Sequence, residues 1–131
     1  MTPLTCLAVA IFFEARAEPT VGMEAVANVI INRVEDSRYP DTVCDVVWEP
    51  SQFSFTHDGL TDDPEAHTGY QDQLAWVTSQ RVADEALQGN LLGITSTHYH
   101  ANYVLPFWAD TYTKDTVIGV HTFYTNQTEY R

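Results

Sequence analysis

Positive charge is scarce in this sequence. Lysine and arginine together number 6, whereas aspartate and glutamate number 18, so the formal net charge at pH 7 is −12. Contacts with nucleic-acid phosphates or anionic lipid surfaces depend on cations, so this balance disfavours nucleic-acid and membrane partners. Hydrophobic residues make up 44% of the 131 residues, which is the composition of a folded domain. The length predicts one domain over residues 1–131, and we expect a monomer.

Long hydrophobic runs are also missing. The longest, 7–13, has seven residues, against the roughly 20 that a membrane-spanning helix needs. No basic region precedes it, so no secretory signal is visible. We therefore expect a protein that stays where it is made, is released by lysis, or lacks its leader.

Cysteine is rare as well, because Cys6 and Cys44 are the only two. They show no C-x-x-C spacing, which excludes a zinc site built from cysteines alone. They are either two buried thiols or one disulfide.

Apolar residues recur at helical spacing early in the chain. They predict a helix that starts at Pro3 and ends at or before Glu18, and a second helix from about Thr20. A third helix is predicted over 70–87. Segment 42–48 is short and apolar, so it is either a helical turn or a strand.

The rest of the chain differs in composition. Residues 49–69 are rich in Asp, Gly, Pro, Ser and Thr and predict a long irregular region, which in a small domain is usually functional. Strand composition appears in 95–100 and 117–124. Helices followed by a small antiparallel sheet predict an α+β fold.

Glu14 is the first candidate for chemistry. It follows two phenylalanines near the end of an apolar helix. A carboxyl group against aromatic rings loses hydration, which raises its pKa and suits it to donate a proton. Glu18, one turn later, would raise this pKa further by like-charge repulsion. The alternative is a solvated residue at the helix end, paired with Arg16 or Arg33.

A second cluster lies in the predicted strand 95–100. His98 and His100 would share one face of that strand. They could hydrogen-bond a sugar, pack as ordinary core residues, or bind zinc with His121 or His57 as a third ligand. No H-E-x-x-H spacing is present, so we expect neither a metal nor another cofactor.

The irregular region supplies a third cluster, Gln52-Phe53-Ser54. An amide, an aromatic ring and a hydroxyl are the groups that a carbohydrate cleft uses, since rings stack on sugars and polar groups bind hydroxyls and acetamides.

Several blocks together resemble a known family. They are Cys6–Pro19, Gly22, Ala25–Val34, Tyr39–Val47, Gln52–Ser54, Thr97–Ala101 and Ile118–Tyr124. In this order they resemble the SleB/CwlJ-type cell wall hydrolases, which are spore cortex-lytic enzymes and their phage relatives. The resemblance covers nearly the whole chain. It departs from the family pattern at Ala17, where glycine is usual, and at Phe55, where tryptophan is common. It also departs at Phe12, where a tyrosine is common, which removes a possible hydrogen bond near Glu14 but not the acid itself.

The resemblance implies a lysozyme-like, two-lobed catalytic domain that cuts the glycan strands of peptidoglycan. It implies that Glu14 is the catalytic acid of a lytic transglycosylase, which acts between N-acetylmuramic acid and N-acetylglucosamine and leaves anhydromuramic ends. The expected cleft residues are Gln52, Phe53, Ser54, His98, Tyr99, His100 and His121.

Three other functions remain open at this stage: a hydrolytic muramidase, a histidine-based metal-dependent wall amidase, and a non-catalytic glycan-binding module. The expected place of action is the cell wall. The size suits a phage lysin released by lysis, and a bacterial enzyme equally. Since Cys6 and Cys44 lie in blocks that flank the first two helices, we expect them to approach each other.

Overall fold

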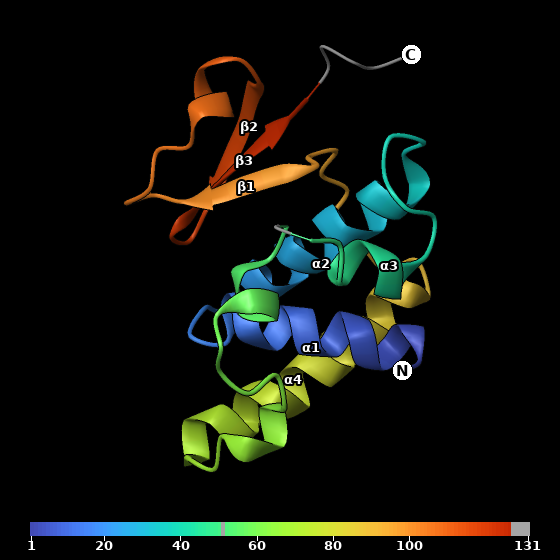
Figure 1. The fold of residues 1–131 in the computed structure, drawn as a ribbon, viewed down its shortest axis with the longest axis vertical. Coiled ribbons are helices and arrows are strands. Elements are labelled where there is room, and N and C mark those ends of the chain that lie inside the picture. Colours follow the sequence, from blue (N-terminus) through green and yellow to red (C-terminus); the bar gives the residue numbers. More distant parts are fainter. Residues whose placement is uncertain (51, 127–131) are drawn as a thin grey trace.

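The computed structural model describes residues 1–50 and 52–126, and in these residues four α-helices precede a three-stranded sheet (Figure 1). Helix α1 (Pro3–Ala15) starts as its sequence predicts, because the Thr2 side chain accepts a hydrogen bond from the Thr5 amide and Pro3 occupies the first turn. Helix α2 (Thr20–Glu35) begins directly after Pro19. Both predicted helices are confirmed.

Helix α1 is the centre of the helical lobe. Its residues 6–12 are all buried, on every side of the helix, because α2, α3 and α4 pack around it. Helix α3 (Val43–Val47) settles the alternative for this segment in favour of a helix. A disulfide joins Cys6 of α1 to Cys44 of α3, with the two Cα atoms 5.3 Å apart, so the expected approach of the cysteines is confirmed.

The region between α3 and the next helix is largely irregular, as predicted. It holds two short 3₁₀ helices, η1 (Ser54–His57) and η2 (Pro64–Ala66). Helix α4 (Tyr70–Leu87) then packs against α1 and α2, within the bounds that the sequence predicts. No helix in the described part of the chain is long and apolar enough to cross a membrane.

The sheet has the antiparallel order β1-β3-β2. Its strands are β1 (His98–Ala101), β2 (Thr113–Ile118) and β3 (His121–Thr125). The strand composition of 117–124 is confirmed, but Gly119, with φ of +59°, turns the chain and divides this block between the end of β2 and most of β3. A positive φ of this kind favours glycine.

Alternation along the strands gives the sheet two different faces. Tyr99 and Phe123 are paired across β1 and β3 and face the helical lobe, where Phe123 packs on Ala25 and Val29 of α2. His98, on the opposite face, packs against rings that follow β1. In Figure 1 the sheet lies over α2, and the start of β1 passes close to that helix.

Candidate active site

Glu14 lies in the last turn of α1, partly exposed, at the junction of the helical lobe and the sheet. The Tyr99 hydroxyl of β1 donates a hydrogen bond to its Oε1 atom. The structure thus joins the candidate acid to one of the predicted cleft residues. Phe12, where relatives commonly have a tyrosine, is fully buried and has no hydroxyl. The hydroxyl that contacts Glu14 belongs to Tyr99 of the sheet.

Burial is the main influence on the Glu14 carboxyl group. It raises the pKa of Glu14 above the ordinary value of 4.5, while the Tyr99 hydrogen bond and the positive charge of Arg33 lower it. The pKa of Tyr99 is itself raised well above 10, first by burial and then by the Glu14 charge. Tyr99 therefore keeps its proton and remains a donor to Glu14.

Glu18 has a different role from the expected one. The raised pKa of Glu14 is due to burial and not to the charge of Glu18. The Glu18 carboxylate binds the β2–β3 turn instead. Its Oε1 accepts a hydrogen bond from the Val120 amide at 3.1 Å and lies 3.8 Å from Nδ1 of His121. Sequence spacing places Glu18 one helical turn from Glu14, but α1 ends at Ala15, so the helical spacing does not continue to Glu18.

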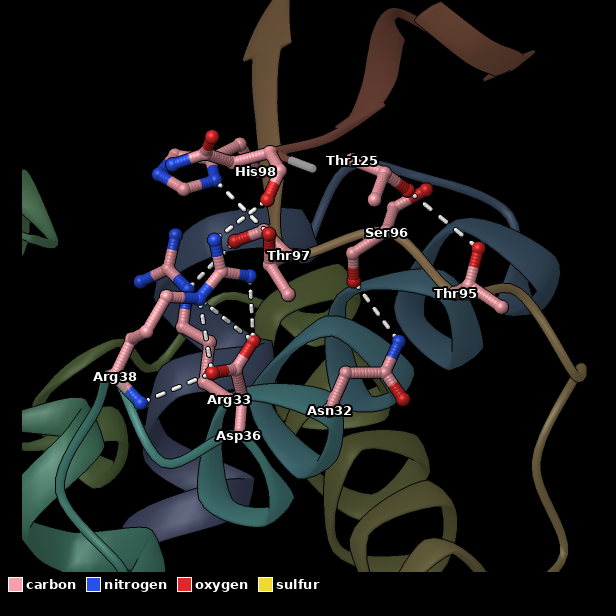
Figure 2. A network of polar contacts seen from close by, with 10 residues as sticks. Asn32, Arg33, Asp36, Arg38, Thr95, Ser96, Thr97, His98 and Thr125 are labelled. Carbon is pink, nitrogen blue, oxygen red and sulfur yellow. Dashed lines mark hydrogen bonds and ion pairs between the residues drawn. The ribbon is translucent and has the colours of Figure 1, made fainter. Parts of the chain in front are cut away.

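Arg33 is a central residue of the site that the sequence brought up only as an alternative partner of Glu14. Its side chain comes from α2 and the residue is 4% exposed. Nε donates to the Thr97 carbonyl oxygen at 2.7 Å, and Nη1 donates to Oε1 of Gln52 at 3.1 Å. Figure 2 shows Arg33 reaching from α2 to Thr97, beside the Asp36–Arg38 ion pair. The signal in the sequence was an arginine inside an otherwise apolar helical stripe.

The Gln52-Phe53-Ser54 cluster is divided between the surface and the core. Gln52 and Ser54 are exposed, and Gln52 is held by Arg33. Phe53 is 2% exposed, and the Arg33 guanidinium lies 5.5 Å from its ring centre. The expectation that Phe53 offers a ring face to a sugar is therefore corrected: its ring belongs to the core and supports Arg33.

His98 and His100 lie on the face of the sheet opposite to Tyr99. Burial, with the charges of Arg33 and Arg38, lowers the pKa of His98 to about 4, so this ring is neutral at pH 7. Nδ1 of His100 donates to the Ala101 carbonyl oxygen at 2.7 Å. Its Nε2 lies 2.9 Å from the Tyr124 hydroxyl, within hydrogen-bond distance.

His121 lies on the Tyr99 face, with the two ring centres 5.1 Å apart. Burial lowers the pKa of His121, and the nearby Glu18 charge opposes this. His121 is therefore separated from His98 and His100 by the sheet itself, and His57 lies at the exposed end of η1. In 1–50 and 52–126, no three or more His, Cys, Asp or Glu side chains are grouped so that they could hold a metal ion.

Two acidic side chains of the irregular region stabilise local turns. Oδ1 of Asp58 accepts from the Leu60 amide, and Oδ1 of Asp63 accepts from the Glu65 amide. Glu49, which the sequence did not single out, is different, because it acts on the Arg33 guanidinium together with Glu14. Its Oε1 atom is buried and has no hydrogen-bond partner among the described residues.

A pocket at the carboxyl end of α2 lies apart from Glu14. Its lining residues are Asn32, Glu35, Asp36, Arg38, Thr95, Thr97 and Thr125. Several of them appear in Figure 2. The pocket shares Thr97 with the Arg33 contacts but contains none of the predicted cleft residues.

This fold and this site define a family. The model of the cell wall hydrolase family matches residues 17–124, and the chain belongs to that family. The match begins after Glu14, so the family model itself does not include this residue.

Two curated relatives are spore cortex-lytic enzymes. The one from Halalkalibacterium halodurans is 42% identical over 71 residues, which are 52% of this chain and 22% of the relative. The one from Bacillus subtilis is 43% identical over 81 residues, which are 62% of this chain and 27% of the relative. The chain thus spans about a quarter of the length of these relatives.

Two solved structures share the fold over nearly its whole length. The catalytic domain of the germination-specific lytic transglycosylase SleB from Bacillus anthracis is 29% identical with a TM-score of 0.75, covering 94% of this chain and 93% of that chain. The catalytic domain of SleB from Bacillus cereus is 28% identical with a TM-score of 0.75, covering 94% and 89%. The resemblance and the α+β fold predicted from sequence are both confirmed. These relatives are bacterial and do not support a phage origin.

Proposed function

We propose that this chain is a single catalytic domain that cleaves peptidoglycan glycan strands as a lytic transglycosylase, with Glu14 as its acid. The observation that carries the proposal is the Glu14 carboxyl group, whose pKa is raised by burial and whose Oε1 is held by Tyr99. This group lies in a fold shared with SleB catalytic domains. The substrate is the bond between N-acetylmuramic acid and N-acetylglucosamine, in cell wall or spore cortex peptidoglycan.

Glu14 performs the first step as a general acid. Because Tyr99 donates to Oε1, the transferable proton is carried by Oε2. Oε2 gives this proton to the bridging oxygen, the glycosidic bond breaks, and positive charge develops at the anomeric carbon of muramic acid. The raised pKa keeps Glu14 protonated at a higher pH than an ordinary glutamate.

The same carboxylate then performs the second step as a base. It takes the proton of the C6 hydroxyl of muramic acid, whose oxygen bonds to the anomeric carbon and closes the anhydro ring. One group serves both steps in turn, as microscopic reversibility allows. Tyr99 and Arg33 stabilise the carboxylate between the two steps, since both lower the pKa of Glu14.

A hydrolytic muramidase is the second candidate, and Glu49 favours it. A retaining or inverting hydrolase needs a second carboxylate roughly 5 to 9.5 Å from the acid. Glu49 and Glu14 both act on Arg33, and the buried Oε1 of Glu49 has no hydrogen-bond partner among the described residues. Asp62 has a buried, unpartnered oxygen too, but only Glu49 also acts on Arg33, so Glu49 is the base that a hydrolytic product would indicate first.

The Glu14→Gln variant tests the proposal. Glutamine keeps the shape of the side chain and still accepts from Tyr99, but it has no proton to give. We expect a folded variant whose release of glycan fragments from purified sacculi falls at least about a hundredfold. Glu85→Gln, the same change at an exposed residue of α4, is the matched control and should retain full activity. A folded Glu14→Gln variant that still cleaves sacculi at the control rate would refute the proposal.

A further inference from the structure

Arg33 is a cation enclosed at the junction of the two lobes. The residue is 4% exposed, and its guanidinium lies 5.5 Å from the ring centres of both Tyr39 and Phe53. Burial lowers the pKa of Arg33 below its ordinary value. A buried charge is costly unless it is paired and hydrogen-bonded, so the contacts of the Arg33 guanidinium are needed to keep it buried.

Its hydrogen bonds connect segments that are far apart in sequence. Nε holds the Thr97 carbonyl oxygen, 64 residues along the chain, and Nη1 holds Gln52, 19 residues along. Thr97 precedes Tyr99 by two residues in the same extended segment, and its amide donates to the Tyr124 carbonyl oxygen of β3. Arg33 therefore fixes the backbone that carries the Tyr99 hydroxyl to Glu14.

The positive charge of Arg33 also acts on Glu14, because it lowers the pKa of that carboxyl group. The titratable groups that act on or respond to the guanidinium are Glu14 of α1, Glu49 after α3, Tyr39 after α2, and Tyr99 and His98 of β1. The two tyrosines stay protonated because their pKa values are raised, and the low pKa of His98 keeps that ring neutral. Among the described residues, Arg38 and Asp36 also act on this cluster, since both charges influence the pKa of Tyr39 and the charge of Arg38 also lowers the pKa of His98.

We propose that Arg33 is a positioning residue of the glycan-cleaving reaction: it anchors Gln52 and the segment that carries Tyr99 to Glu14, and its charge stabilises the carboxylate that remains after proton transfer. The inference rests on the proposed function. Arg33 itself need not touch the substrate, because its effect passes through Glu14, Tyr99 and Gln52.

Two substitutions separate the charge from the hydrogen bonds. Arg33→Lys keeps a positive charge, but a single ammonium group does not reproduce the planar fork that serves Thr97 and Gln52 together. Arg33→Gln removes the charge. Arg81→Gln is the matched control, since Arg81 is an exposed arginine of α4 that pairs with Glu85.

The experiment measures kcat and KM on purified sacculi across pH for the wild type and the three variants. The alkaline limb of the profile is the range above the pH optimum in which the rate falls, and it follows the loss of the Glu14 proton. Removing the cation raises the pKa of Glu14, so Arg33→Gln should move this limb to higher pH. Its kcat should also fall at least about tenfold. Arg33→Lys should keep the limb near its wild-type position but still lose kcat, and Arg81→Gln should match the wild type.

A folded Arg33→Gln variant with an unmoved alkaline limb would overturn the inference, as would wild-type kcat in Arg33→Lys. If Arg33→Gln does not fold, Arg33→Lys decides by its kcat alone. Failure of the proposed function is distinguishable, because Glu14→Gln would then remain active. Cleavage that depends on Glu14 but not on Arg33 would refute only the role of Arg33.

Discussion

Replacing Tyr99 with phenylalanine removes a single hydroxyl group from the site. The ring should stay in place, because its centre lies 5.4 Å from that of Phe123 and 5.1 Å from that of His121. The lost interaction is the hydrogen bond to Oε1 of Glu14. A hydrogen bond to a charged group contributes about 1.5 to 3 kcal/mol.

This hydrogen bond is strongest when Glu14 is ionised, which is the state formed as the proton leaves. Its loss should therefore raise the barrier to proton transfer and lower kcat by about 10- to 150-fold. Loss of the bond also raises the pKa of Glu14, since Tyr99 lowers that pKa in the wild type. The acid then stays protonated to a higher pH, so the alkaline limb of the rate profile should move upward.

The assay is the rate of fragment release from sacculi between acid and alkaline pH, with fragments quantified by chromatography. Tyr124→Phe is the control, because it deletes a hydroxyl that contacts His100 on the opposite face of the sheet. It should leave the alkaline limb in place. A folded Tyr99→Phe variant with the wild-type rate and limb would show that the hydroxyl does not act on the acid.

Three further predictions concern stability. At neutral pH, Glu14→Gln should unfold at a higher denaturant concentration than the wild type. The pKa of Glu14 is raised in the folded state, so ionisation of this group lowers the free energy of unfolding of the wild type as pH rises above 4.5. The difference between the two proteins should vanish below that pH, and a difference that is constant with pH would contradict the prediction. Gly119→Ala should destabilise the protein by about 1 to 2 kcal/mol in urea titrations, since a Cβ would lie 2.4 Å from Oε1 of Glu18 at a positive φ; an unchanged midpoint would argue against it. Reduction of the Cys6–Cys44 disulfide, which closes a separation of 38 residues, should lower the free energy of unfolding by about 4 kcal/mol, and identical melting with and without reductant would refute this.

The helical lobe was largely predictable from sequence because its signals are local. The cap at Thr2, the break at Pro19 and the apolar periodicity act within a few residues, and the observed helices follow them. The sheet was less predictable. Residues 117–124 have strand composition throughout, and only the conformation of Gly119 reveals the turn. Strand β2 also contains Lys114 and Asp115, which interrupt any apolar alternation.

The candidate acid could be named from its neighbours in sequence, but its partners could not. Tyr99 meets Glu14 across 85 residues, and Arg33 meets Thr97 across 64. Such contacts depend on how the sheet packs on α2, which local patterns do not encode. Glu18 is a case in which a local pattern misled. Helical spacing predicts that Glu18 neighbours Glu14, but α1 ends at Ala15 and the Glu18 carboxylate binds the β2–β3 turn.

The most direct test of the central claim is mass spectrometry of the fragments released from sacculi digested in ¹⁸O-labelled water. A lytic transglycosylase uses the C6 hydroxyl of muramic acid, so we predict anhydromuramic ends that are one water lighter than reducing ends and carry no label. The same products should be absent from the Glu14→Gln digest. Labelled reducing ends would contradict the account, and would make Glu49 the candidate for the base that activates water.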